Sequence, residues 1–191
     1  MGLVNPVTRA LRSPALKPAR MFVRRLQGPL RALPDFVIIG AQKSGTSSLY
    51  RYLAQHPQVR ECVLKEVHYF DGGLEDGIDT YALGPSWYRS HFPLKREMTP
   101  GLQTFEASPL YLLHPLVAER IAGLMPQAKL VAMLRDPTER ALSHYFHNVR
   151  DNDRRRFKED LGVQAAMDAE AGRLAPVLAA GDYKSEVYRA L

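Results

Sequence analysis

Cysteine is almost absent from this chain of 191 residues, in which Cys62 is the single example. One cysteine cannot form an intrachain disulfide, and it cannot build a cysteine cage around a metal ion. The scarcity of cysteine favours a reducing compartment, so the sequence predicts a cytoplasmic location.

Long apolar runs are also absent, since no stretch approaches the roughly 20 residues that cross a bilayer. This excludes an integral membrane protein with helical spans. The first 34 residues lack the apolar core of about 7 to 15 residues that a secretory signal requires, so no cleaved signal is expected.

Acidic residues are missing from residues 1–34, which contain seven Lys or Arg. In the rest of the chain nineteen bases face twenty acids, so the net charge of +6 belongs to the N-terminal segment. A nucleic-acid-binding domain is therefore not expected. We interpret residues 1–34 as a basic arm and residues 35–191 as one folded domain. The arm is either a solvated extension or a segment that contacts a membrane surface or a partner.

Strands alternate with helices in the predicted domain. Apolar runs predict buried strands at 36–39 and 129–134, and a short strand is predicted at 103–107. Helical spacing predicts helices over 49–54, 81–92, 115–124 and 137–150, then an Ala- and Leu-rich helix after the charged stretch 150–160, and a helical start at 183–191. The alternation predicts an α/β fold with a doubly wound, mostly parallel sheet.

A P-loop-like phosphate-binding loop is predicted between the first strand and the first helix, at Gly40-Ala-Gln-Lys-Ser-Gly-Thr-Ser47. Its glycines permit a tight backbone, its N–H groups and the helix N-terminus face an anion, and Lys43 supplies a positive charge. A Walker A loop places its lysine after the second glycine, where this chain has Thr46, so a P-loop nucleotide kinase is the weaker alternative. The other alternative is a glycine-containing turn that binds no ligand.

Two segments of the sequence resemble the carbohydrate, heparan sulfate sulfotransferase-like branch of the sulfotransferases that use 3′-phosphoadenosine 5′-phosphosulfate (PAPS). The family's 5′-phosphosulfate loop is similar to 42–47, and its 3′-phosphate segment is similar to Arg135-Asp-Pro-Thr-Glu-Arg140-Ala-Leu-Ser143. The resemblance implies PAPS as sulfuryl donor, a hydroxyl or amine acceptor, expected to be a carbohydrate, and no metal. It implies these cofactor-binding residues: Lys43, Ser44, Gly45, Thr46, Ser47, Arg135 and Ser143.

A third segment, Lys65-Glu-Val-His-Tyr-Phe-Asp71, is similar to the part of heparan sulfate sulfotransferases that supplies the general base. The resemblance implies that Glu66 is the general base, while Lys43 is expected to stabilise the leaving phosphate. Alternation along an extended segment would place Glu66 and His68 on one face, where His68 either orients or replaces the base, or is only structural.

The acceptor side departs from the heparan sulfate pattern, which usually has Lys before Ser-Pro where this chain has Ala107. The hydroxyls of Ser108 and Tyr111 either serve the site or belong to a helix cap and a packed ring. The acceptor and the choice between O- and N-sulfation stay open.

The resemblance covers about 34–150 and lacks the family's C-terminal part, with a further strand and a basic loop. Residues 35–191 are thus expected to be the N-terminal and central part of a sulfotransferase domain. A catalytically silent binding module, recruited through the basic arm, is the alternative from another functional class.

Overall fold

The computed structural model describes residues 17–74, 77–150 and 161–180. Its centre is a sheet of four parallel strands within these residues, in the order β2-β3-β1-β4. The strands are β1 (Phe36–Gly40), β2 (Val59–Glu61), β3 (Gln103–Ala107) and β4 (Lys129–Ala132). The predicted parallel α/β sheet is confirmed.

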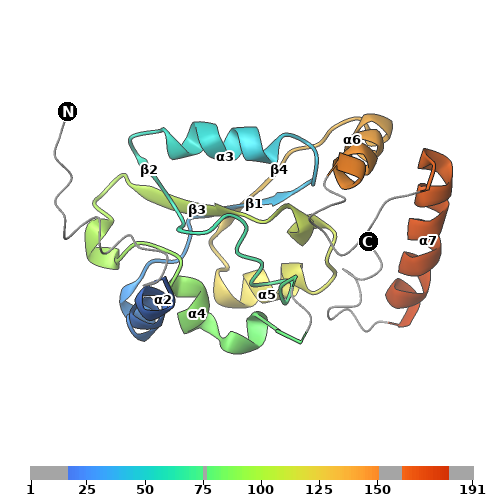
Figure 1. Ribbon diagram of the computed structural model, residues 1–191. Helices are drawn as coiled ribbons and strands as arrows, with labels where there is room; N and C mark the ends of the chain where they lie inside the picture. The colour runs from blue at the N-terminus through green and yellow to red at the C-terminus, as the bar shows by residue number, and fades with distance from the viewer. Residues whose placement is uncertain (1–16, 75–76, 151–160, 181–191) are drawn as a thin grey trace.

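Helices lie on both faces of the sheet (Figure 1). One face carries α3 (Thr46–Ala54), and the other carries α4 (Pro85–Arg89) and α5 (Val117–Leu124). The chain continues from β4 into α6 (Pro137–Arg150) and α7 (Val163–Ala180). Short 3-10 turns complete the structure: η2 (Gly28–Leu30), η3 (Tyr81–Leu83), η4 (Lys95–Glu97) and η5 (Pro109–Leu112). Residues 151–160 of the predicted charged stretch and the predicted helical start at 183–191 lie outside the described residues.

Aromatic side chains fill much of the core. Phe105 of β3 stacks on Phe36 of β1, with 5.0 Å between ring centroids, and also contacts Tyr50 of α3. On the other face, Tyr69 stacks on Tyr88 at 4.6 Å. Each buried aromatic removes a large apolar area from water, so these contacts fix α3 and α4 on the two faces of the sheet.

The prediction of a buried strand at 129–134 is only partly right. The strand β4 ends at Ala132, and Leu130 and Leu134 are 50% and 80% exposed. An apolar run identifies a strand, but burial also requires cover, and β4 lies at the edge of the sheet. The helix predicted over 81–92 is likewise divided, because Gly84 adopts a φ of +82° and Pro85 begins a new helix.

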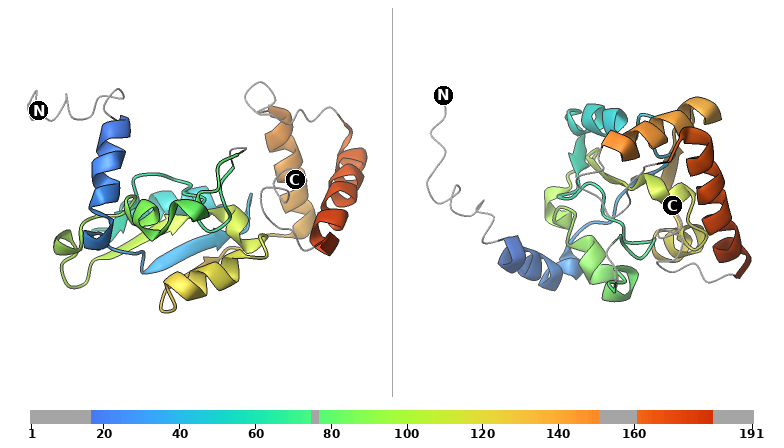
Figure 2. Two further views of the ribbon diagram at one scale, coloured as in Figure 1. Left: turned by 90° about the horizontal axis from the view of Figure 1, so that it is seen from below. Right: turned by 45° about the vertical axis from the view of Figure 1, so that its right-hand side comes forward.

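Part of the basic arm packs on the rest of the chain. Its helix α2 (Lys17–Leu26) lies beside α4 (Figure 2). Just after α4, Arg24 donates from Nε to the Ser90 carbonyl at 2.5 Å and from Nη2 to the Phe92 carbonyl at 2.8 Å. The buried Arg31 donates to the same Phe92 carbonyl at 2.7 Å. Among the described residues, none of the helices has the length and apolar character of a membrane span.

Candidate active site

The loop between β1 and α3 contains the predicted phosphate-binding residues. It is tied to the chain after β4 by two backbone hydrogen bonds, from Ala41 N to Met133 O at 2.8 Å and from Met133 N to Gly40 O at 2.7 Å. Gly45 caps α3 with a φ of +91°, and Lys43 has a φ of +67°. The first backbone hydrogen bonds of α3 run from Ser48 N and Leu49 N to the Gly45 carbonyl, at 3.0 and 3.1 Å. The N–H groups of Thr46 and Ser47 precede them and have no carbonyl one turn earlier in the helix, so this loop offers donors to an anion.

One buried hydroxyl supports a phosphate in this loop. The Ser44 Oγ is buried and has no hydrogen-bond partner within the described part of the chain. A buried polar group without a partner is costly, and a phosphate oxygen would satisfy it. Gly40 has another role, since a Cβ there would lie 2.7 Å from the Leu112 Cβ and 2.9 Å from the Pro109 carbonyl. The chain therefore needs glycine at position 40 for packing against η5.

Arg135 brings the second predicted phosphate segment to the loop. Its Nη1 lies 3.5 Å from the Lys43 carbonyl, and its Nε pairs with Glu139 Oε2 at 3.1 Å. Ser143 is half-buried on α6, and its convergence with Arg135 on one phosphate stays a prediction.

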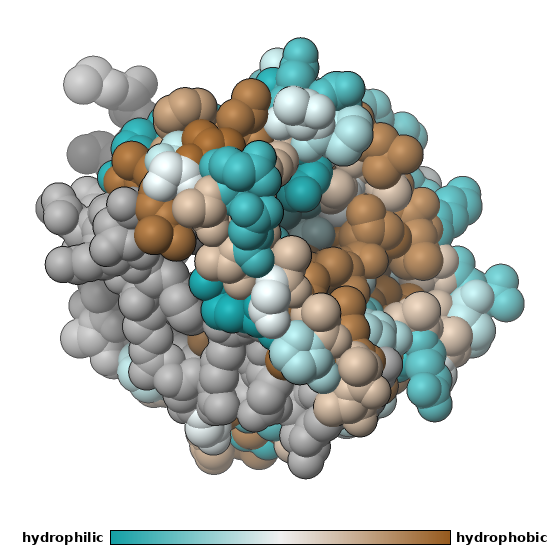
Figure 3. Space-filling view, turned by 90° about the vertical axis from the view of Figure 1, so that its right-hand side faces the viewer, coloured by the Kyte–Doolittle hydropathy of each residue, from teal (hydrophilic) through white to brown (hydrophobic). Residues whose placement is uncertain are grey.

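Arg140 lines a pocket of about 280 Å³ between α6 and α7. Other lining residues are His144, Tyr145, Asn148, Glu170 and Leu174. Figure 3 shows this side of the molecule, where hydrophobic patches lie beside hydrophilic ones. Tyr145 is half-buried beside this pocket and donates from its hydroxyl to the Leu161 carbonyl at 2.9 Å.

The segment after β2 forms a chain of charged contacts. Glu66 Oε1 lies 3.1 Å from Lys65 Nζ, and Glu66 Oε2 lies 3.1 Å from His68 Nε2. The other ring nitrogen of His68, Nδ1, lies 2.7 Å from Oδ2 of the buried Asp71. Glu66 and His68, which were predicted to share one face of an extended segment, contact each other, but the predicted extended segment is wrong. The backbone turns at His68, whose φ is +51°.

These contacts set the charges of the pair. Burial lowers the pKa of His68, but the hydrogen bonds that its ring donates to Asp71 and Glu66 outweigh it and raise that pKa to about 9. Burial raises the pKa of Glu66, but the contacts with His68 and Lys65 outweigh it and the net effect is a lowered pKa. At neutral pH the site therefore holds an imidazolium beside a carboxylate.

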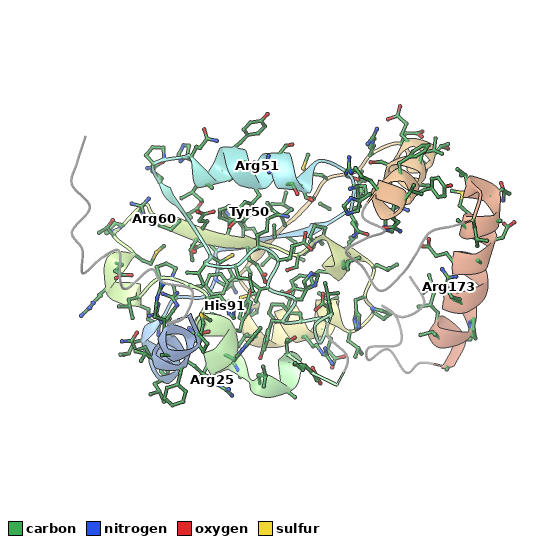
Figure 4. All side chains as sticks on the ribbon, in the orientation of Figure 1. Arg25, Tyr50, Arg51, Arg60, His91 and Arg173 are labelled. Carbon is green, nitrogen blue, oxygen red and sulfur yellow. The ribbon has the colours of Figure 1, made fainter. Side chains whose placement is uncertain are left out.

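Lys65 joins this segment to the phosphate-binding loop. Its Nζ donates to Ser47 Oγ at 3.2 Å and lies 5.8 Å from the ring centroid of Tyr50, which points from α3 toward the sheet (Figure 4). The contacts of Lys65 and Arg135 bring three predicted segments, around Lys43, Glu66 and Arg135, to one place.

Two acidic residues of this region were not predicted. Asp71 belongs to the quoted segment, and its spacing from His68 was the available signal. Glu106, at the end of β3, is fully buried and accepts hydrogen bonds from Tyr88, Ser108 and Tyr111. Burial raises its pKa to about 7. Both Ser108 and Tyr111 are buried as well, so their hydroxyls serve the interior of the protein.

Cys62 is buried, and burial together with the nearby Glu106 raises the pKa of its thiol to about 12. A thiol in this state is not a nucleophile at neutral pH. Within 17–74, 77–150 and 161–180, no group of three or more His, Cys, Asp and Glu side chains is arranged to hold a metal ion.

Comparison with known proteins gives a consistent result. Residues 33–177 match the family described as "Sulfotransferase domain". The chain is 38% identical over 124 residues to the membrane-associated sulfotransferase kil1 of Dictyostelium discoideum, covering 65% of this chain and 25% of that protein. It is 34% identical over 131 residues to human heparan sulfate glucosamine 3-O-sulfotransferase 5, covering 69% of this chain and 35% of that protein.

A solved structure is also similar. The sulfotransferase from Alicyclobacillus acidocaldarius superposes with a TM-score of 0.59 at 31% identity, covering 83% of this chain and 64% of that one. The match bears out the predicted fold class. The chain spans about a quarter to a third of the two relatives named above.

Proposed function

Because the chain belongs to the sulfotransferase domain family, we propose that it transfers a sulfuryl group from PAPS to a hydroxyl or amine of a carbohydrate acceptor. One observation carries this proposal. The phosphate-binding loop, the Arg135 segment and the Glu66 segment meet through the contacts of Arg135 with Lys43 and of Lys65 with Ser47. The site for the anionic sulfuryl donor and the base for the acceptor therefore lie side by side.

PAPS would supply the sulfuryl group, with its 5′-phosphosulfate at Lys43, Ser44, Gly45, Thr46 and Ser47 and its 3′-phosphate at Arg135 and Ser143. The loop N–H groups and the Ser44 hydroxyl act as donors, and Lys43 stabilises the negative charge that grows on the leaving phosphate. Arg135 offers a planar fork of donors that matches a phosphate.

Glu66 takes the proton of the acceptor. Both of its oxygens already accept hydrogen bonds, but a carboxylate has about four lone-pair sites, so each oxygen can accept one more. As the acceptor oxygen or nitrogen bonds to sulfur, its proton passes to Glu66 and the bond between sulfur and the phosphate oxygen breaks. The imidazolium of His68, held by Asp71, orients the carboxylate.

A carbohydrate acceptor is supported by the relatives, two kinds of which carry names that specify heparan sulfate. The cation before Ser-Pro is replaced by Ala107, so we expect a less anionic acceptor than heparan sulfate. A cytoplasmic location, a membrane or partner contact of the basic arm, and the domain boundary at residue 34 stay predictions.

The test is transfer of radiolabelled sulfate from PAPS to a panel of neutral and anionic oligosaccharides. We expect transfer to at least one glycan, lost in Lys43→Ala and kept in Arg51→Ala, an exposed arginine on α3. Tight binding of ATP with Mg²⁺ without sulfate transfer would favour the kinase. Binding to anionic vesicles without binding of 3′-phosphoadenosine 5′-phosphate (PAP) would favour the silent module.

A further inference from the structure

Glu106 is a carboxylate with no exposed surface at the end of β3. Three hydroxyls donate to it, Tyr88 at 2.6 Å and Tyr111 at 3.3 Å to Oε1, and Ser108 at 3.2 Å to Oε2. A buried carboxylate is costly unless such donors surround it. Its presence in the core therefore calls for a reason beyond packing.

The reason lies in what two of these hydroxyls accept. Ser108 Oγ accepts from Val67 N and His68 N, at 3.1 and 3.2 Å. The hydroxyl of Tyr111 accepts from Tyr69 N at 2.9 Å and from Phe70 N at 3.4 Å. Four consecutive backbone N–H groups are thus bound by two hydroxyls.

This arrangement fixes the direction of every hydrogen bond. A serine hydroxyl has two acceptor sites and one proton, and both acceptor sites of Ser108 are occupied. The proton of Ser108 must therefore be donated to a group that accepts. The same holds for the Tyr111 hydroxyl, which also accepts from two N–H groups. An ionised carboxylate meets this demand because it carries no proton of its own, and with a pKa of about 7 Glu106 is mostly ionised at pH 8. A glutamine would turn an N–H group toward one of the two hydroxyls, where no acceptor site is left.

The segment held in this way contains the turn at His68, where a φ of +51° is unfavourable for a residue with a side chain. The same turn places the His68 ring against Glu66 and Asp71. We propose that Glu106 is a positioning residue which, through Ser108 and Tyr111, holds the 67–70 turn and so keeps His68 in contact with Glu66. Its bearing on catalysis rests on the function proposed above.

The main test compares Glu106→Gln with Thr104→Val in sulfate transfer at pH 8. Thr104 is a buried residue of the same strand, and its hydroxyl donates to the Arg60 carbonyl at 2.7 Å and to none of the groups around Glu106. We expect Glu106→Gln to lower kcat by about 10- to 100-fold, as for a misplaced base, and to leave the KM for PAPS within about threefold. Thr104→Val should keep kcat within about twofold.

A second readout does not require turnover. An NMR titration of His68 should give a pKa near 9 in the native protein and in Thr104→Val. In Glu106→Gln the pKa should fall toward the ordinary value of 6.5, because the contacts with Glu66 and Asp71 loosen. Loss of stability alone, with the turn intact, would leave this pKa in place.

Ser108→Ala provides an independent route, since it removes the acceptor for Val67 N and His68 N while Glu106 stays ionised. It should lower kcat and the pKa of His68 in the same way, and the double variant should be no worse than the poorer single one. If Glu106→Gln does not fold, the His68 pKa and the kcat of Ser108→Ala test the proposal in its place. An unchanged His68 pKa in the folded variants overturns the proposal, even if no sulfate transfer is found in the native protein.

Discussion

At the scale of single residues, the pair of Glu66 and His68 determines the acid–base chemistry. Glu66 lies between two cations, so it is ionised over the whole neutral range. This keeps the carboxylate ready to accept a proton, although a lowered pKa makes it a weaker base than an isolated glutamate. The role of general base therefore depends on position, and the amide of glutamine cannot replace it.

Glu66→Gln should lower turnover by about 100-fold or more while PAP binding stays nearly intact. The amide keeps the size of the side chain but cannot take the acceptor's proton. Steady-state kinetics and a PAP titration measure the two effects. Glu119→Gln, at an exposed position of α5, is the matched control and should change neither. Unchanged turnover in Glu66→Gln would move the role to His68.

The raised pKa of His68 predicts how stability depends on pH. The folded protein binds this proton up to about pH 9 and the unfolded chain only up to about 6.5, so the stabilisation is complete below pH 6.5. As pH rises from 6.5 to 9 the free energy of unfolding should fall, by up to about 1.4 kcal/mol per pH unit. Urea unfolding at several pH values measures this slope.

His68→Asn should flatten the slope. His91 is the control, because burial lowers its pKa and places its own titration below pH 6.5 (Figure 4). His91→Asn should therefore leave the slope between pH 6.5 and 9 unchanged. The same slope in native protein and His68→Asn would show that His68 is not held as a cation.

Sequence reasoning at this scale found residues that belong to short local patterns. Lys43, Glu66 and Arg135 each lie in a motif that can be seen in a few neighbouring positions. Glu106 could not be assigned in this way, since it acts on a backbone segment about forty residues earlier. Only the pairing of β3 within the sheet shows this connection.

At the scale of elements, the basic arm and α4 are joined by arginine side chains. Arg24→Gln should lower the free energy of unfolding by about 1 to 3 kcal/mol, because a charged donor to two partly buried carbonyls is lost. Arg20→Gln on the same helix, at an exposed position, should change it by less than about 0.5 kcal/mol. Thermal or urea unfolding measures the stability of the two variants. An equally small loss of stability in both would mean that Arg24 does not stabilise the packing of α2 against α4.

The loop before α3 depends on the left-handed backbone of Gly45. Gly45→Ala should cost about 1 to 2 kcal/mol of stability from the backbone, since its nearest neighbour, Met133 Cε, leaves room for a Cβ at 3.5 Å. PAP affinity should fall as well. Gly101→Ala has a similar φ of +86° and serves as control. It should lose stability but keep PAP affinity, and an equal loss of affinity in both would contradict a specific role for this loop.

Helices and strands were predicted well where the spacing of apolar residues agrees with residues that begin or end an element, as in the strand of 103–107 and the helix of 137–150. The burial of β4 was predicted wrongly, because the hydrophobicity of a residue does not show whether another part of the protein covers it. The charge of residues 1–34 likewise did not show that part of this segment packs on α4.

At the scale of the whole molecule, the site follows the carboxyl ends of parallel strands. The phosphate-binding loop follows β1, the Glu66 segment follows β2, Ser108 follows β3 and Arg135 follows β4. Ligands of open parallel sheets bind at this end, where loops from several strands meet. The fold thus explains why segments about ninety residues apart, such as those of Lys43 and Arg135, are in contact.

The binding of PAPS tests this account most directly. PAPS and adenosine 5′-phosphosulfate differ only in the 3′-phosphate that we place at Arg135 and Ser143. A ligand that binds only the folded protein raises its melting temperature by mass action. The account predicts a clear rise with PAPS and a much smaller one with adenosine 5′-phosphosulfate at the same concentration, with the difference lost in Arg135→Ala. Equal rises with the two ligands, or none with PAPS, would contradict it.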